Sequence, residues 1–308
     1  MRIAVLGARG QLGAALVHEF AAGHDIRAFG RAELDISNDG AVAAAMAEIR
    51  PQVILNGAAF TDVDAAEDRP IDALNSNAFG VRTLARAAQE HGAVLVHYST
   101  DFVFDGCAAT PYVETDAPNP QSVYGASKLL GEWFAQDAPG ACVLRVESIF
   151  GETPGAGAPK GSAAGILRGL RAGGEVKVFD DRTITPSYVS DAARATRQLI
   201  ESHAPAGLYH CVNSGPTTWY EFALEMARLI GVEPRLTKVR MGDMNLRAKR
   251  PLYCALSNDK LRSIGIDMPT WQDALARYLG ARGADYASAD KNAEQEARSS
   301  TDYTDFTD

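Results

Sequence analysis

The sequence has few cysteines, and their spacing gives them no structural task. The four cysteines are Cys107, Cys142, Cys211 and Cys254, with no C-x-x-C pair and no histidine at the spacing of a metal ligand. A disulfide framework or a cysteine-rich metal module is therefore excluded as the basis of the fold. We predict free thiols in a reducing compartment and no metal site.

Long apolar runs are also missing. No stretch approaches the roughly 18–20 uninterrupted apolar residues of a membrane helix. The run Ile3–Leu6 is too short for a signal peptide and stops at a glycine, which favours a buried strand. We therefore expect a cytoplasmic protein without a membrane partner. An excess of positive charge is missing as well, since the net charge is −9, and this argues against nucleic acid as a partner.

The end of the chain has almost no large aliphatic residues. Residues 281–308 hold seven acidic and three basic side chains among alanine, serine and threonine. Such a segment cannot bury enough surface to offset the entropy that ordering it would cost. We predict that 281–308 is a disordered or peripheral acidic tail.

Strand-like apolar runs alternate with helical patterns through residues 1–150. The predicted strands are Ile3–Leu6, Ile26–Phe29, Val53–Asn56, Val94–Tyr98 and Cys142–Val146. The predicted helices between and after them cover 12–22, 39–49, 71–91 and 123–136. This alternation predicts an α/β fold with a Rossmann-type doubly wound parallel sheet, in which 1–150 is the NAD(P)-binding domain.

The pattern changes after about residue 150. A loop rich in glycine and proline, Gly151–Gly161, comes first. Predicted helices follow at 163–171, 191–201, 219–230 and 271–279, with a strand at 208–212. We predict that 151–280 is a smaller, C-terminal substrate-binding lobe interleaved with the first domain, and that part of 184–213 completes the sheet.

A glycine-rich loop follows the first predicted strand directly. Gly7, Gly10 and Gly13 form a G-x-x-G-x-x-G pattern between that strand and a helix. Glycines allow a tight turn, bring backbone N–H groups close to a pyrophosphate and expose a helix N-terminus to its charge. A glycine triplet alone is weak evidence, but this position predicts a dinucleotide site.

The end of the second predicted strand bears on the choice between NADPH and NADH. An acidic residue there would bind the ribose 2′-hydroxyl of NAD, whereas this chain has Arg31. Arg31 is suited to a 2′-phosphate, and the alternative is a solvated surface arginine. Asp35 lies slightly further on and is an alternative contact for adenine or ribose. The sequence favours NADPH as cofactor and leaves NADH as the alternative.

A second set of polar residues follows the fourth predicted strand. Thr100 lies at the carboxyl end of that strand, where such sheets bind ligands. Tyr124 and Lys128 come next at helical i, i+4 spacing and therefore share a helix face. An ammonium near a phenol lowers its pKa, so Tyr124 is suited to protonate an alkoxide as hydride arrives, or to take that proton in reverse. Lys128 is suited to hold the nicotinamide ribose, and Thr100 to hydrogen-bond the substrate oxygen; Tyr124 as a packing residue is the alternative.

In these motifs the sequence resembles the dTDP-4-dehydrorhamnose reductase family, within the extended short-chain dehydrogenase/reductases. The matching segments are Gly7–Gly13, Gly30-Arg31 with Glu33–Ile36, Asn56–Thr61, Val63-Asp64 with Ala66-Glu67, Asn75 and Asn77, His97–Phe104, Glu114–Asp116, Pro120, Val123–Gly125 with Ser127-Lys128, Gly207–His210 and Arg250-Pro251. The resemblance covers roughly 1–280 and is densest before residue 150.

The resemblance implies NADPH-dependent reduction of a 4-keto-6-deoxy sugar on a nucleoside diphosphate, with Tyr124 as the proton donor. It implies that the sugar is held by Thr100 and Asp101. It also implies a set of residues that line the cofactor, namely Gly10, Gln11, Leu12, Arg31, Asp35, Ala58, Ala59 and Thr61.

One segment departs from the family pattern. The family usually has Thr-Ser-Trp after Leu144-Arg145, whereas this chain has Val146-Glu147-Ser148. We predict that Ser148 lies at the sugar in place of an aromatic wall, which leaves the identity of the sugar open. Arg250 is predicted to pair with the diphosphate, with a surface salt bridge as the alternative.

Other functions on this fold are weighed against reduction. A nucleotide-sugar 4-epimerase uses the same Tyr, Lys and bound cofactor and remains an alternative. A 4,6-dehydratase is disfavoured, because Asp101 is followed by Phe102 and not by glutamate. A non-catalytic regulatory subunit resembling that of methionine adenosyltransferase is the alternative from another class. In this family helices 71–91 and 123–136 would form a four-helix seam, which makes a homodimer a hypothesis.

Overall fold

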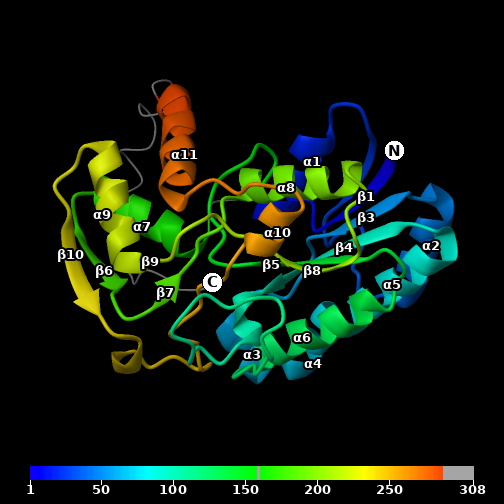
Figure 1. The fold of residues 1–308 in the computed structure, drawn as a ribbon, viewed down its shortest axis with the longest axis horizontal. Helices are drawn as coiled ribbons and strands as arrows, with labels where there is room; N and C mark the ends of the chain where they lie inside the picture. The colour runs from blue at the N-terminus through cyan, green and yellow to red at the C-terminus, as the bar shows by residue number, and fades with distance from the viewer. Residues whose placement is uncertain (158–159, 287–308) are drawn as a thin grey trace.

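Six parallel strands form the central sheet (Figure 1). In order across the sheet they are β2 (Asp25–Phe29), β1 (Arg2–Leu6), β3 (Val53–Asn56), β4 (Val94–Thr100), β5 (Cys142–Val146) and β8 (Gly207–His210). The computed structural model describes residues 1–157 and 160–286, without the side chains of 281–286. Strand order reverses between β1 and β3, so the prediction of a doubly wound parallel sheet is confirmed.

Helices cover both faces of this sheet (Figure 1). On one face α1 (Gln11–Phe20) packs against α8 (Val189–Glu201). On the other face lie α2 (Asp39–Ile49), α5 (Gly80–His91) and α6 (Val123–Gln136). Because both faces are covered, the inner strands are largely buried, and every residue of β3 is, whereas the edge strand β2 keeps exposed positions.

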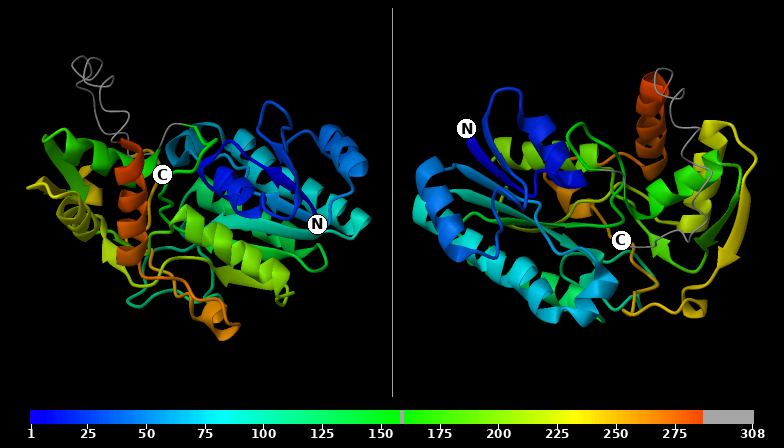
Figure 2. Two further views of the ribbon diagram at one scale, coloured as in Figure 1. Left: turned by 90° about the horizontal axis from the view of Figure 1, so that it is seen from above. Right: turned by 180° about the vertical axis from the view of Figure 1, so that it is seen from behind.

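A smaller lobe lies to one side of the sheet (Figure 2). Its elements are α7 (Gly161–Arg171), β6 (Glu175–Phe179), α9 (Trp219–Ile230), β10 (Arg235–Val239) and α11 (Trp271–Tyr286). Strands β6 and β10 pair in parallel, and the short strands β7 (Thr183–Ile184) and β9 (Thr217–Thr218) pair antiparallel. The remaining short helices are α3 (Val63–Asp68), α4 (Pro70–Leu74), η2 (Asp101–Val103), η3 (Met241–Asp243) and α10 (Asp259–Ser263).

Several local predictions differ from the structure. The helix predicted at 71–91 is continuous but not α-helical throughout, because a π-helical turn, η1 (Asn75–Phe79), lies between α4 and α5. Strands β6 and β10 were not predicted, because the exposed, charged residues of their surface face interrupt the apolar pattern. The last helix continues through 281–286, so the start of the predicted tail is helical; the rest of that tail lies outside the described residues.

Two predictions about composition can be compared with the structure. All four cysteines are free thiols, and Cys107 alone among them is exposed. Among the described residues, no helix combines the length and the apolar character needed to cross a membrane.

Candidate active site

A cavity of about 850 Å³ lies at the carboxyl ends of the strands. Its walls come from the glycine loop, the ends of β2, β3 and β4, helix α6 and the segment after β5. The cavity is lined by most of the predicted site residues, namely Gly7, Gly10, Gln11, Leu12, Arg31, Asp35, Ala58, Ala59, Thr61, Thr100, Asp101, Tyr124, Lys128 and Ser148. Gly13 and Arg250 are not part of its lining.

The glycine loop has the geometry that a bound diphosphate requires. Gly7 has φ +72°, and a β-carbon there would lie 2.6 Å from the Ala58 nitrogen. A β-carbon on Gly13 would lie 2.1 Å from the Gly7 oxygen, so Gly13 lets α1 pack directly beneath the loop. Gly10 is the N-cap of α1 and offers no side-chain cap, so the first N–H groups of the helix lack a side-chain partner where Gly10, Gln11 and Leu12 line the cavity. These residues fit a dinucleotide.

Two exposed arginines lie beside Gly30 at the cavity: Arg31 follows it in the chain, and the Arg9 side chain comes within 3.0 Å of where a Gly30 β-carbon would lie. Arg31 Nε contacts Asp35 Oδ2 at 3.2 Å, and Arg9 pairs with Glu33. Burial acts to raise the pKa of Asp35, but hydrogen bonds from Ser37 and the Arg31 charge hold it below its ordinary value. Both arginines line the cavity. Arg9 was not predicted, although a basic residue inside a glycine loop is a readable signal.

Helix α6 brings Tyr124 and Lys128 to the cavity. Ser122 caps the helix, its hydroxyl accepting from the Gly125 N–H at 3.1 Å. The Lys128 ammonium is buried and donates to the Tyr98 carbonyl. Burial lowers the pKa of Lys128 to about 8, while the Glu132 charge acts in the opposite direction.

The Tyr124 ring is held by its neighbour across the site. It packs edge-on against Phe102, with ring centroids 5.5 Å apart. Gly125 permits this approach, because a β-carbon there would lie 2.3 Å from the Phe102 oxygen. The helix can therefore lie directly against the turn that follows β4.

Two hydroxyl groups at the end of β4 differ in their hydrogen bonds. Thr100 Oγ1 donates to Asp101 Oδ1 at 2.9 Å and accepts from the Phe102 N–H at 3.2 Å. The Ser99 hydroxyl is buried at the cavity wall and has no hydrogen-bond partner within the described residues. A buried polar atom without a partner is costly unless a ligand completes it, so Ser99 also fits a cofactor or substrate.

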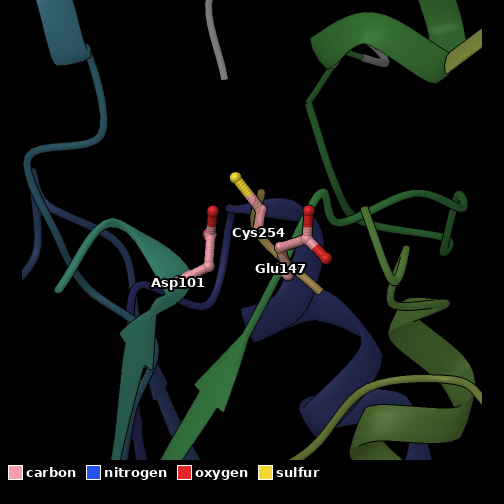
Figure 3. Close-up of side chains that lie close together, drawn as sticks. All are labelled: Asp101, Glu147 and Cys254. Carbon is pink, nitrogen blue, oxygen red and sulfur yellow. The ribbon is translucent and has the colours of Figure 1, made fainter. Parts of the chain in front are cut away.

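A buried charged cluster, which the sequence did not reveal, adjoins Thr100. Figure 3 shows the side chains of Asp101, Glu147 and Cys254 together; a carboxylate oxygen of each acidic residue and Cys254 Sγ all lie within 4.8 Å of one another. Arg182 joins them: its Nη2 is 3.5 Å from Asp101 Oδ2 and its Nε donates to Cys254 Sγ at 3.4 Å. Four elements far apart in sequence contribute one residue each, so no local motif could have marked the cluster.

Asn77 is a second residue whose role was not predicted. Its Oδ1 accepts from the Phe60 N–H at 2.8 Å and its Nδ2 donates to the Phe60 carbonyl at 2.9 Å. The same Nδ2 contacts Ser127 Oγ at 3.0 Å. Asn77 lies in the π-helical turn and so fastens the loop after β3 to the helix that carries Lys128.

Two predicted substrate residues have unexpected surroundings. Arg250 lies outside the cavity lining, where its guanidinium is buried and pairs with Asp64 at 3.0 and 3.2 Å. Its interaction is therefore a half-buried ion pair, closer to the salt-bridge alternative than to a diphosphate contact. Ser148 does line the cavity, in a left-handed conformation with φ +43°, and its hydroxyl contacts Glu147 Oε1 at 3.2 Å.

The chain was compared with known proteins. Residues 1–282 match the model of the family described as RmlD substrate binding domain. The dTDP-4-dehydrorhamnose reductase of Streptomyces griseus is 36% identical over 90% of this chain and 92% of its own length. The chain belongs to the dTDP-4-dehydrorhamnose reductase family. The resemblance predicted from the motifs is thereby confirmed.

Two further members of the family bear on the site. A Streptomyces antibioticus protein named probable dTDP-4,6-dihydroxy-2-methyloxan-3-one 4-ketoreductase is 36% identical over 89% of this chain and 93% of its own length. The solved structure of the dTDP-4-dehydrorhamnose reductase of Bacillus anthracis, in complex with NADP, is 33% identical with a TM-score of 0.86. It covers 91% of this chain and 99% of its own.

Proposed function

We propose that this protein is an NADPH-dependent oxidoreductase that reduces the 4-keto group of dTDP-4-dehydrorhamnose. The observation that carries the proposal is the placement of Tyr124 and Lys128 in one cavity with the glycine loop, in a chain of this family. The relatives named as reductases and the NADP in the Bacillus anthracis structure support the reaction and the cofactor. They favour reduction over the epimerase and regulatory-subunit alternatives.

The cofactor residues follow from the geometry of the loop. Gly7, Gly10 and Gly13 would bring backbone N–H groups to the diphosphate, with Gln11 and Leu12 beside it. The adenosine would be bordered by Arg31 and Asp35, and the rest of the cofactor by Ala58, Ala59 and Thr61. Arg31 favours the 2′-phosphate of NADPH over NADH. When bound, the cofactor supplies the hydride.

The protein's own residues would manage the proton. The Tyr124 hydroxyl would protonate the sugar oxygen as it gains negative charge, and the buried Lys128 ammonium would stabilise the resulting phenolate. With a pKa near 8, Lys128 still holds most of its charge at neutral pH. Thr100 would donate to the sugar oxygen once substrate competes with Asp101 for its hydrogen, and Asp101 and Ser148 would contact the sugar.

The two parts of the chain would divide these tasks. Residues 1–150 would bind the cofactor, and 151–280 would form the lobe that covers the nucleotide sugar. A homodimer through α5 and α6 is supported by two exposed apolar side chains, Phe79 directly before α5 and Trp133 on α6. Gel filtration at micromolar concentration tests it: the mass of a dimer is expected, and a monomer mass after Trp133→Asp would place the seam there.

Substitution of Tyr124 by phenylalanine tests the function. The variant should lose about 10²–10⁴-fold in kcat with unchanged affinity for NADPH, because the ring still packs on Phe102. The assay follows NADPH absorbance with dTDP-4-dehydrorhamnose, and Tyr220→Phe on α9 is the matched control. Stoichiometric loss of NADPH distinguishes a reductase from an epimerase, which recycles it. Full activity of the Tyr124→Phe variant would refute the assignment.

A further inference from the structure

Glu147 lies at the point where the sheet meets the smaller lobe. It directly follows β5, and its Oε2 accepts from both the N–H of Thr185 and, at 2.8 Å, the Thr185 hydroxyl. Thr185 follows β7 of the smaller lobe and also accepts from the Leu256 N–H at 3.0 Å. One carboxyl group thus ties three chain segments together, at a side chain that is 1% exposed.

The same carboxyl group also contacts a residue of the cavity wall. Its Oε1 contacts the Ser148 hydroxyl at 3.2 Å, and Ser148 lines the cavity in a left-handed conformation that a non-glycine residue rarely adopts. Held in this way, the Ser148 side chain forms the wall at the position where the family usually has tryptophan. Arg182, the buried neighbour of Glu147, lines the same part of the cavity.

The charges around Glu147 do not balance if every group is ionised. Within the part of the chain that the structure describes, the titratable and charged groups that face it are Asp101 from the end of β4, Arg182 before β7 and Cys254 from the segment before α10. Asp101 and Arg182 form a buried ion pair. A second carboxylate within 4.8 Å would then lie unpaired in a low-dielectric environment, which is strongly unfavourable.

We propose that Glu147 is a positioning residue that acts in its uncharged form through hydrogen bonds. These bonds hold the smaller lobe against the end of β5, and they fix the cavity wall at Ser148 and Arg182 that faces the sugar. The part concerning the sugar rests on the proposed function. In the acid form the Glu147 hydroxyl can donate to Ser148 Oγ, which frees the Ser148 hydrogen for a sugar oxygen. Burial and the Asp101 charge raise the pKa of Glu147 well above 4.5, in agreement with this arrangement.

The charge state is tested by stability as a function of pH, which needs no substrate. Because the folded pKa is raised, the folded protein binds one more proton than the unfolded chain, so wild-type stability falls as pH rises from 4.5 to the raised pKa. Glu147→Gln cannot lose this proton. The ratio of its folding equilibrium constant to that of the wild type should therefore rise with pH, by up to about tenfold per pH unit. A ratio that is flat or falls with pH would overturn the proposal.

The positioning role is tested by separating KM from kcat. Glu147→Gln keeps the shape and the acceptor, so KM for dTDP-4-dehydrorhamnose should stay within about twofold of wild type. Glu147→Ala removes the links to Thr185 and Ser148 and should raise this KM about tenfold, with kcat less affected and the Kd of NADPH unchanged. Ser148→Ala should reproduce a smaller part of the rise, about threefold.

Asp191→Asn is the matched control, because Asp191 is also a fully buried carboxyl group but pairs with Arg194 and Arg277 away from the cavity. It should lose stability without a change in KM. An equal KM for the Glu147→Ala variant and wild type would overturn the positioning role. So would a stoichiometric metal ion in the purified protein, since the metal would then hold the cluster. If wild-type protein reduces no nucleotide-linked 4-keto sugar, the proposed function fails, whereas the pH test still decides the charge of Glu147.

Discussion

The two ends of the cavity are built in different ways. The end that we propose binds the cofactor, here the cofactor end, has a wall of backbone at Gly7, which Gly13 lets α1 approach closely, and its charged side chains are exposed: the Arg31 side chain is 74% accessible. The end that we propose binds the sugar, here the sugar end, has a wall of side chains and its charges are buried: the Arg182 side chain is 3% accessible. The cofactor end should therefore tolerate the loss of a charge but not the addition of a methyl group, and the sugar end should behave in the opposite way.

The largest effect is expected from Arg182→Met at the sugar end. Removing this guanidinium leaves the buried Asp101 carboxylate without its ion pair, and breaking a buried pair in this way costs about 3–5 kcal/mol. Urea unfolding measures the loss. Arg194→Met is the control, because Arg194 pairs with a carboxylate but is 39% exposed, and it should cost less than about 1 kcal/mol. Equal losses in the two variants would contradict the contrast between buried and exposed charge.

Gly13→Ala at the cofactor end should have the next largest effect. The added β-carbon would meet the Gly7 oxygen at 2.1 Å, so α1 or the loop must shift and the N–H groups would no longer converge on the diphosphate. Overpacking of this kind costs about 2 kcal/mol, or roughly thirtyfold in NADPH affinity, measured by fluorescence titration. Gly165→Ala in α7, where a β-carbon meets nothing within 4 Å, should leave the affinity unchanged.

The same contrast explains what the sequence could predict. The cofactor end is local: Gly7–Gly13 follows one strand and precedes one helix, so spacing alone places it. The strands of the sheet were predicted for the same reason, because burial on both faces gives continuous apolar runs. Tyr124 and Lys128 also share one helix, which made their juxtaposition predictable from the i, i+4 rule.

The sugar end was predicted only in part. The family resemblance implied Thr100 and Asp101 as sugar contacts, but it did not bring the buried charged cluster together. Asp101, Glu147, Arg182 and Cys254 come from segments up to 153 positions apart, so no local pattern could show that they meet. The π-helical turn at Asn75–Phe79 is similar. It accompanies the hydrogen bonds of Asn77 to Phe60 and Ser127, two residues from other parts of the chain, so helix propensity gave no sign of it.

Arg31→Ala should have a moderate and selective effect. The exposed guanidinium contributes little to stability, but a charge-assisted hydrogen bond to the 2′-phosphate would be lost with it. NADPH affinity should fall about tenfold while NADH affinity stays within about twofold. Arg27→Ala is the control, because Arg27 lies on β2 and is 62% exposed but does not line the cavity. Equal losses for both cofactors would place the 2′-phosphate elsewhere.

The smallest effect is expected from Glu33→Gln. It makes the same substitution as Glu147→Gln, but at an exposed carboxylate and not at a buried carboxyl group. Glu33 pairs with Arg9 in solvent, so the unfolding temperature should stay within about 1 °C of wild type at every pH. Without its Glu33 partner, Arg9 should attract the phosphates of NADPH more strongly and raise NADPH affinity about two- to threefold at low salt. This gain should vanish in 1 M salt, where the Debye length is about 3 Å. Glu225→Gln, which disrupts a similar surface pair on α9, should change neither quantity. If the stability of Glu33→Gln relative to wild type instead rose with pH, solvent would not be screening the Glu33 charge. The contrast between exposed charges at the cofactor end and buried charges at the sugar end would then be wrong.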